Sequence, residues 1–433
     1  MRRNITEEEF FRRVASAGGR AYIVGGAVRD MLLRRPLHDR DYVVCGLTEQ
    51  SFSRVFSKPP KVGRSFPVFL LDIDGNRCEV AFARREVKHG TGYKGFTVDF
   101  TPSISIEDDL YRRDLTINAM ARDAEGRLID PYGGAKDIEE RRIRAVSEHF
   151  SEDPLRALRA ARFAAQFEFT IDEETKKLAR ACGPELIQEP AERKLVELRK
   201  ALSLDRPSLY FRNLLDIGLL EQEFPWIYRL IGQTQPEQHH PEGDAFEHSM
   251  QILDKVSENT DTIEARFAAL MHDIGKGVTP KELLPRHHGH DKAGLEILPE
   301  ITKSLKLPVR WTKSAELVIR EHMRVKRLSG YGKMRDVLYE MYKGPLSPED
   351  FAVIVRADSK GHYNPFVEEH ERCWAAIREA GKRTAAESRL TGPELGKCIR
   401  SREAEALKRE LRRIEWERDS VLAEETAQEE RER

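Results

Sequence analysis

The sequence predicts an α+β protein in which a small mixed α/β head is followed by an elongated all-α body. Its 433 residues, 39% hydrophobic and 34% charged, exceed one ordinary domain and suit several folded units with solvated helix faces. Short apolar runs bounded by glycine alternate with helical patterns up to about Gly134. Beyond Gly134 the periodicity is almost entirely helical, so the two parts follow one another along the chain.

Composition excludes several classes of protein. No stretch approaches the roughly 20 apolar residues of a spanning helix, and the first residues, MRRNITEEEFFRRV, lack the apolar run of a signal peptide. We therefore expect a cytoplasmic protein without a membrane partner. The five cysteines show no C-x-x-C spacing and are predicted to be reduced thiols. Because 73 basic residues balance 74 acidic ones, any nucleic acid must bind a local patch.

The head begins with an amphipathic helix within residues 1–20, for which Thr6 is the expected N-cap. Strands are predicted in five runs: AYIVGG, DRDYVVCG, FPVFLLDIDG, CEVAFARRE and RLIDPYGG. The segment AVRDMLLRR after the first strand has helical spacing.

The body has two predicted amphipathic helices, in DPLRALRAARFAAQFEF and AERKLVELRKALS, before a polar, proline-containing linker at residues 233–243. Eight of the thirteen histidines then fall between His239 and His322, which marks a separate chemical unit. The last segment, from about Lys382, contains a highly charged helix that we expect to pack on the body or to be partly frayed, with no function beyond packing or tRNA contact.

The first group of candidate site residues is a carboxylate pair beside a glycine turn. Asp39 and Asp41 alternate along a predicted strand, so both side chains project from one face and can bind Mg²⁺. Gly25 and Gly26 end the preceding strand, and the helix after them offers backbone N–H groups to an anion, with Arg29 in its first turns. A D-x-D pair or a Gly-Gly turn alone occurs often in ordinary loops and turns. Their combination with a helix within about twenty residues is a stronger indication of a functional site.

These motifs carry a family resemblance. VGGAVRD followed by HDRDYVV resembles the head of the class II tRNA nucleotidyltransferases, the bacterial CCA-adding enzymes and their poly(A) polymerase relatives. RRDLTINAMA, LIDPYGGAKD and SEDPLRALRAARF resemble three further stretches of that family in the same order. The resemblance extends from about residue 20 to residue 370. It implies a Mg²⁺-dependent transfer in which Asp39 and Asp41 are catalytic.

The resemblance also assigns residues to the nucleotide. Arg113 contacts phosphate or ribose, with Asp114 and Asn118 as supporting polar groups. Asp153 and Arg156 present base-pair-like hydrogen-bonding edges to the incoming C or A. The remaining arginines of the same predicted helix help with the triphosphate or with the orientation of that pair, and they are Arg159 and Arg162.

Three other interpretations stay open at this stage. The three arginines of that helix, spaced every three residues, form a basic stripe but also fit a solvated charged face. The polar segment between Arg84 and Asp109 is an ordinary surface loop or, by the resemblance, the flexible loop of the switch from C to A addition. Glu79 is a candidate third carboxylate, although a strand glutamate can equally pair with a nearby arginine.

The second group combines histidines and aspartates. His272 and Asp273 end the apolar stretch RFAALMHDIGKG, where two polar side chains are costly unless a hydrogen bond or a metal satisfies them. With His248, His322 and Asp358, they resemble an HD-type metal-dependent phosphohydrolase domain.

That second resemblance implies four metal ligands, namely His248, His272, Asp273 and Asp358. Four more histidines are left undecided among ligands, phosphate contacts and supporting groups: His287, His288, His290 and His322. Lys276 either reaches a phosphate or lies in solvent. Mixed histidine and carboxylate ligands suit a transition metal or Mg²⁺, so the identity of this divalent ion is open. Metal-assisted attack of water on a phosphoester is the expected chemistry.

Together the resemblances imply a CCA-adding enzyme that uses CTP, ATP and tRNA, without a nucleic-acid template, fused to a phosphohydrolase of phosphomonoesters or 2′,3′-cyclic phosphates. The expected parts are a nucleotidyltransferase head (1–140), a helical nucleotide- and tRNA-binding region (141–235), an HD domain that can mediate a homodimer (236–380), and a charged helical segment (381–433). The alternatives are a poly(A) polymerase, a CC-only or A-only enzyme, and a binding protein with decayed sites. The mixed-charge end AEETAQEERER differs from the basic tail usual in poly(A) polymerases.

Overall fold

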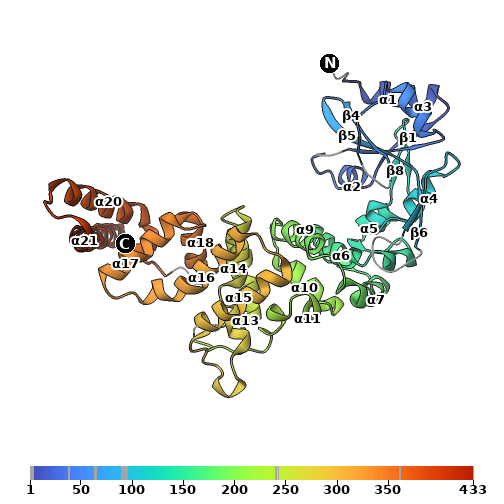
Figure 1. The fold of residues 1–433 in the computed structure, drawn as a ribbon. Helices are drawn as coiled ribbons and strands as arrows, with labels where there is room; N and C mark the ends of the chain where they lie inside the picture. The colour runs from blue at the N-terminus through green and yellow to red at the C-terminus, as the bar shows by residue number, and fades with distance from the viewer. Residues whose placement is uncertain are drawn as a thin grey trace. The chain divides into compact units, whose positions relative to one another are not determined.

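The computed structural model describes residues 4–37, 40–62, 66–88, 96–238, 241, 243–359 and 362–432. The predicted catalytic residue Asp39 lies outside these ranges. The chain folds into two compact units, each described by itself below (Figure 1). The N-terminal unit comprises Met1–Ala201 and Leu209–Glu223, and the C-terminal unit comprises Leu202–Ser208 and Phe224–Arg433.

The head is built on a mixed seven-stranded sheet of order β3-β4-β5-β2-β1-β8-β9 (Figure 1). Its strands are β1 (Arg20–Val24), β2 (Asp41–Cys45), β3 (Lys61–Val62), β4 (Val68–Ile73), β5 (Asn76–Phe82), β8 (Ala121–Arg122) and β9 (Leu128–Ile129). Strand β2 pairs antiparallel with β1 and parallel with β5. Alternate residues of β1 enter two different apolar clusters, so the sheet is buried on both faces. The five predicted strands are confirmed.

Helices and one hairpin surround this sheet. The helices are α1 (Glu7–Ser16), α2 (Gly26–Leu32), α3 (Glu49–Val55), α4 (Ile106–Tyr111) and α5 (Gly134–Glu139). Thr6 caps α1 as predicted, because its side chain accepts a hydrogen bond from the Glu9 N–H at 3.1 Å. The polar segment after Arg84 contains the paired strands β6 (Arg85–Lys88) and β7 (Phe96–Asp99), and residues 89–95 between them lie outside the described ranges.

The rest of the N-terminal unit is mainly helical. Its helices are α6 (Leu155–Phe167), α7 (Glu173–Ala181), α8 (Gly183–Leu186), α9 (Ala191–Leu202), α10 (Ser208–Ile217) and α11 (Leu220–Glu223). The prediction of an almost entirely helical chain beyond Gly134 is confirmed, with the short strands β10 (Arg142–Ile143) and β11 (Thr170–Ile171), which pair in parallel, as an exception to an all-α body. Two-residue strands are too short to produce a periodic pattern in the sequence.

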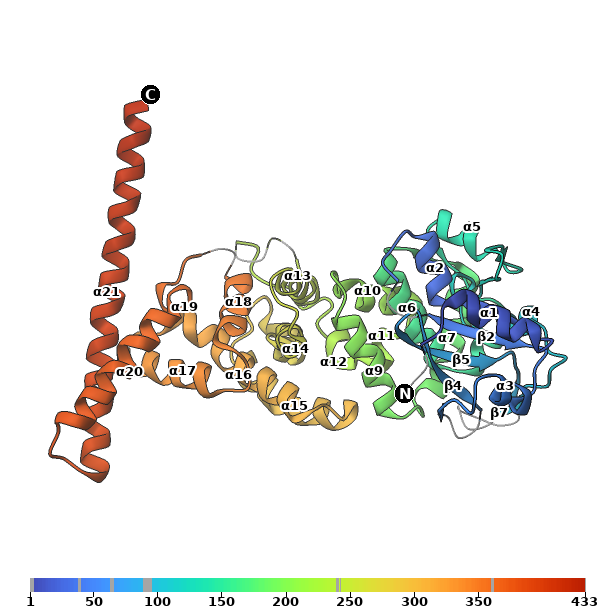
Figure 2. The ribbon, with the colours of Figure 1, turned by 90° about the horizontal axis from the view of Figure 1, so that it is seen from above.

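The C-terminal unit is a series of packed helices (Figure 2). They are α12 (Pro225–Tyr228), α13 (Ala245–Ser257), α14 (Ile263–Met271), α15 (His290–Leu305), α16 (Val309–Arg327), α17 (Tyr331–Lys343), α18 (Pro348–Asp358), α19 (Pro365–Glu368), α20 (His370–Glu387) and α21 (Gly392–Glu432). None of the described helices is both long and apolar enough to cross a membrane.

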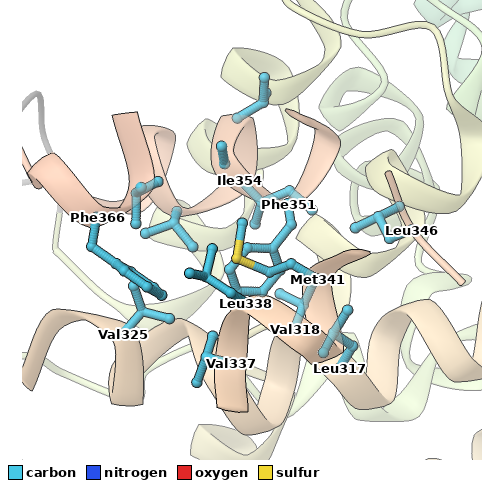
Figure 3. Close-up of a cluster of buried hydrophobic side chains, with 14 of the residues drawn as sticks. Leu317, Val318, Val325, Val337, Leu338, Met341, Leu346, Phe351, Ile354 and Phe366 are labelled. Atoms are coloured by element: carbon cyan, nitrogen blue, oxygen red, sulfur yellow. The ribbon is translucent and has the colours of Figure 1, made fainter. Parts of the chain in front are cut away.

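A large apolar cluster holds α16, α17, α18 and α19 together, and Figure 3 shows residues from each of these helices, including Val318, Leu338, Phe351 and Phe366. Helix α21 joins the same cluster through Leu407 and Leu411. The prediction that the charged C-terminal helix packs on the body is therefore confirmed.

Candidate functional site

The N-terminal unit contains a cavity of about 690 Å³ with an excess of basic side chains on its walls. Seven arginines, one lysine and four aspartates line it. Eleven predicted site residues meet there: Gly25, Gly26, Arg29, Asp41, Arg113, Asp114, Asn118, Asp153, Arg156, Arg159 and Arg162. Because they come from four separate sequence motifs, the fold brings distant segments to one site, and its positive charge suits a triphosphate.

Asp41 and Glu79 provide adjacent carboxylates at the edge of the site. Asp41, the first residue of β2, lies in register with Glu79 of β5, and both residues are exposed. Residues in register on neighbouring strands project from the same face, so the two side chains lie beside each other. Oxygen donors of this kind fit a hard divalent cation. Glu79 itself does not line the cavity, whereas Asp41 does.

The turn between β1 and α2 explains why glycine precedes the helix. Gly25 has φ of +66°, and a Cβ atom there would lie 2.8 Å from Nη1 of Arg113. Arg113 donates to the fully buried Asp109 at 3.0 Å and to the Asn118 carbonyl at 3.3 Å. Burial opposes ionisation of Asp109, but Arg112 and Arg113 keep its pKa below the ordinary value. Arg113 is therefore fixed against the glycine turn.

A chain of hydrogen bonds positions two further arginines. Arg29 donates to Asn118 Oδ1 at 2.6 Å, and the Asn118 amide donates to Asp114 Oδ1 at 3.3 Å. Arg159 donates to Asp114 Oδ2 at 2.7 Å. Burial would raise the pKa of Asp114, yet Arg159 and Arg156 lower it to about 2. Asp114 and Asn118 thus hold arginines in place, as expected for supporting groups.

The predicted base-reading residues do not hydrogen-bond to each other through their side chains. Arg156 donates to the carbonyls of His149 and Arg112, both at 2.7 Å. The Asp153 carboxylate accepts from Arg193 at 3.0 Å. Protein groups therefore bind both side chains in this structure, while further N–H donors of Arg156 and further lone pairs of the Asp153 carboxylate remain for a base.

The basic stripe on α6 is not a solvated face. Arg162 is 6% exposed and donates to Glu197 Oε2 at 2.6 Å. Arg156 and Arg159 are likewise bonded to protein groups. The stripe consequently serves both the packing of the unit and the wall of the cavity.

Three basic residues on the cavity wall were not predicted from the sequence, namely Arg112, Arg193 and Lys200. Arg193 and Lys200 are seven residues apart on α9, two helical turns, so they share a face. That spacing in the sequence could have indicated that the two residues act together. Arg112 directly precedes the predicted residue Arg113, and no pattern in the sequence distinguished it.

The C-terminal unit brings the predicted HD residues to one buried cluster. His248 comes from α13, His272 and Asp273 follow α14, and Asp358 ends α18. The close distances are His248 Nε2 to Asp358 Oδ1 at 3.1 Å, His272 Nε2 to Asp273 Oδ2 at 3.2 Å, and His248 Nε2 to His272 Nε2 at 3.3 Å.

Two more histidines approach the other oxygen of the same aspartate. His290 Nε2 lies 3.2 Å and His322 Nε2 lies 3.5 Å from Asp273 Oδ1. Two groups with the geometry to hold a metal ion therefore share Asp273: one adds His248 and His272, and the other adds His290 and His322.

The ring orientations fit metal ligation. Nδ1 of His272 and of His290 lies 2.7 Å from a backbone carbonyl oxygen, and Nδ1 of His322 lies 2.9 Å from one, so each Nδ1–H donates and Nε2 faces the cluster. Asp273 Oδ1 and the Nε2 atoms of His290 and His322 are buried without a hydrogen bond to any described residue. A bound cation would satisfy these atoms.

The other two undecided histidines do not join the cluster. Both ring nitrogens of His287 are engaged, with the Thr279 hydroxyl at 2.8 Å and the Thr234 carbonyl at 3.0 Å. His288 is exposed.

Two lysines flank the cluster. Lys276 is buried rather than solvated, and its ammonium contacts Asp273, while Lys326 contacts Asp358. Burial would raise the pKa of both carboxyl groups, but Lys276 with His272 holds that of Asp273 well below its usual range. The pKa of Asp358 is also well below its usual range, because His248, His272 and Lys326 outweigh its burial. Lys326 was not predicted from the sequence.

Three segments of the chain match known family models. Residues 21–144 match the Poly A polymerase head domain, residues 168–230 match a probable RNA and SrmB-binding site of polymerase A, and residues 245–359 match the HD domain. The fold and the two sites thus define a nucleotidyltransferase-type head joined to an HD domain.

Sequence identity to individual relatives shows which family within this class the chain belongs to. The chain is 43% identical to the multifunctional CCA protein of Mannheimia succiniciproducens, over 78% of this chain and 84% of the relative. It is 39% identical to the multifunctional CCA protein of Pseudomonas fluorescens, over 90% of this chain and 98% of the relative. The chain belongs to the family of the multifunctional CCA proteins.

A solved structure shares the fold at lower identity. The crystal structure of the Bacillus stearothermophilus CCA-adding enzyme in complex with CTP is 23% identical, with a TM-score of 0.63, and covers 96% of this chain and 98% of that one.

Proposed function

We propose that this chain is a CCA-adding tRNA nucleotidyltransferase that transfers CMP and AMP from CTP and ATP to the tRNA 3′ end. No nucleic-acid template is required, and the HD unit hydrolyses phosphomonoesters or 2′,3′-cyclic phosphates. The observation that carries this proposal is the convergence of residues from four motifs on one basic cavity. The names of the relatives support the same activity.

In the head, Asp41 and the neighbouring Asp39 would hold Mg²⁺, with Glu79 as a third carboxylate beside Asp41. When bound, Mg²⁺ lowers the barrier to attack of the tRNA 3′-hydroxyl on the α-phosphate, with release of pyrophosphate. Arg113 and Arg159, which Asp109 and Asp114 hold by hydrogen bonds, would bind the triphosphate.

The segment around the start of α6 would select the base. Asp153 offers acceptor oxygens and Arg156 N–H donors, which together can recognise C or A. Arg29 and Arg162 then maintain the shape of the wall rather than contact the base, because each is buried and bonded to a protein acceptor.

In the HD unit, His248, His272, Asp273 and Asp358 would hold one divalent ion, and Asp273 with His290 and His322 would hold a second. Bound ions of this kind polarise a phosphoester and activate water. In the absence of a metal ion, Lys276 and Lys326 balance the negative charge of the Asp273 and Asp358 carboxylates. When a metal ion is bound, the two lysines would bind a substrate phosphate.

We also propose the functional division given by the sequence, with residues 141–235 contacting the acceptor end of tRNA by shape and backbone contacts. A cytoplasmic location follows from the substrates, tRNA and nucleoside triphosphates. The homodimer stays a prediction, which sedimentation velocity of the full chain would test.

The deciding experiment incubates the full chain with Mg²⁺, labelled CTP and ATP, and tRNAs that end before CCA, after C and after CC. Products sized at nucleotide resolution should show addition that stops at CCA. Long A tails would identify a poly(A) polymerase, and CC-only or A-only products a partial enzyme. The proposal would be overturned, in favour of a binding protein, if the natural chain incorporated no nucleotide into any tRNA and so gave the same result as the Asp41→Ala chain.

A further inference from the structure

One aromatic ring lies among the arginines of the basic cavity in the N-terminal unit. Phe163 of α6 lines this cavity, although most of the other lining residues are charged. The guanidinium carbon of Arg162 lies 4.2 Å from the centroid of the Phe163 ring. Those of Arg29 and Arg159 lie 5.2 Å and 5.3 Å from the same point. Because a ring face attracts a cation within about 6 Å of its centroid, three arginines from α2 and α6 share one ring.

Two separate sets of hydrogen bonds hold the other sides of these arginines. The first set joins Arg29 to Arg159 through an asparagine and an aspartate. The second set holds Arg162 to Glu197 of α9. The Phe163 ring contacts the arginines of both sets, so it links the position of one set to that of the other.

The positive charges around this ring repel one another. Burial lowers the pKa of the Arg29 guanidinium, Asp30 opposes this effect, and the charge of Arg162 adds to it. Arg29 and Arg162 are only 7% and 6% exposed, so water screens their repulsion weakly. The electron-rich face of Phe163 offsets part of this repulsion. A carboxylate in its place would also hold the arginines, but it would cancel part of the positive charge that suits a triphosphate.

We infer that Phe163 is a positioning residue for the triphosphate of the incoming nucleotide, because it holds three guanidinium groups together and adds no negative charge to the cavity. The inference rests on the proposed nucleotidyltransferase function. Phe163 is 7% exposed, so little of its surface is left for direct contact with a base. Loss of the ring should consequently weaken the binding of CTP and of ATP to the same extent.

The test measures the dissociation constants of CTP and ATP by titration of the full chain in Mg²⁺ without tRNA, so it does not require nucleotide addition. Phe163→Leu keeps an apolar side chain but removes the ring. It should weaken the binding of both nucleotides about tenfold. Phe163→Tyr keeps the ring face and should bind both nucleotides within about twofold of the natural chain.

A graded series separates the ring face from its volume. Phenylalanines with one, two and three fluorine atoms at position 163 keep nearly the same shape, while fluorine withdraws electron density from the ring face. The dissociation constant for CTP should therefore rise with each added fluorine. The same series at Phe69 is the matched control and should leave binding unchanged, because Phe69 is 2% exposed and packs against Phe52 and Phe82 without lining the cavity. Thermal unfolding of each variant checks its fold.

Equal binding of CTP along the fluorinated series at position 163 would overturn the inference, since Phe163 would then act only through its volume. A loss for CTP that differs from the loss for ATP would also overturn it and would assign the ring to the base. Should the natural chain bind the nucleotides but add none to tRNA, the transferase proposal fails, while the titration still decides the role of Phe163. A natural chain that binds neither nucleotide would reject both.

Discussion

The guanidinium of Arg193, on α9, donates at 3.0 Å to the carboxylate of Asp153, which lies two residues before α6 begins, and both residues line the cavity. The same guanidinium also bonds to Glu189, which is 6% exposed. A residue outside the nucleotide-selecting motif thus orients the carboxylate that is proposed to read the base. Discrimination between nucleotides should then depend on Arg193 as well as on Asp153.

Arg193→Met should reduce the preference for CTP and ATP over UTP and GTP by about tenfold, because a hydrogen bond to a charged group contributes about 1.5 to 3 kcal/mol. Primer extension on tRNA with each triphosphate separately measures kcat/KM. Arg127→Met is the control, since Arg127 is a largely exposed arginine of the head away from the cavity. A uniform loss for all four nucleotides would assign Arg193 to triphosphate binding instead.

Glu79→Gln should weaken the response of nucleotide addition to Mg²⁺ if the carboxylate beside Asp41 is a third ligand. The Mg²⁺ concentration for half-maximal addition is expected to rise about tenfold, while the KM for CTP at saturating Mg²⁺ changes little. An unchanged Mg²⁺ curve would leave Glu79 as an ordinary exposed strand residue.

The buried ion pair between Arg162 and Glu197 allows stability and activity to be separated. Arg162→Met alone removes the close partner of the buried Glu197 and leaves only the longer ion pair with Lys200 at 3.7 Å, which should cost about 3 kcal/mol of the free energy of unfolding. The double variant Arg162→Met with Glu197→Leu should recover most of that stability. Urea unfolding measures both effects. If addition also recovers in the double variant, Arg162 serves packing; a persistent activity loss would indicate nucleotide contact.

Local patterns and motif order predicted much of this molecule, for physical reasons. Strands such as β2 and helices such as α6 have strong periodicity, and the residues of a motif stay together because they are close in sequence. The pairing of Asp41 with Glu79 could also have been proposed from the sequence, since both residues belong to predicted strands. What the sequence did not show is which distant side chains pair. Arg193 bonds across 40 residues and Lys326 across 32, and only the tertiary fold sets such distances.

Asp114 predicts a measurable pH dependence of stability. Its folded-state pKa is lowered to about 2 from 3.8, mainly because the charges of Arg159 and Arg156 outweigh burial. A lowered pKa stabilises the folded chain above the unfolded value of 3.8, and this contribution is lost as pH falls through the range down to 2. The contribution is about 2 kcal/mol at neutral pH, of which about 1 kcal/mol is lost by pH 3.

Asp114→Asn should lack this contribution. Its free energy of unfolding should therefore fall less between pH 6 and pH 3 than that of the natural chain, by about 1 kcal/mol. Urea titrations at both pH values provide the comparison. Parallel decreases in the two proteins would contradict the assigned role of Asp114.

Asp273 is placed to be shared by two metal ions, so the number of ions bound should depend on which ligand is removed. The Asp41→Ala chain is the background, because loss of one proposed ligand should weaken metal binding by the head. Equilibrium dialysis against Mn²⁺ should then find two ions per chain, one in His290→Asn and none held tightly in Asp273→Asn. His287→Asn should keep both, since its ring nitrogens are bonded to Thr279 and Thr234. One ion in the background that His290→Asn does not remove would instead indicate a single-metal site, with His290 and His322 as hydrogen-bonding groups around it.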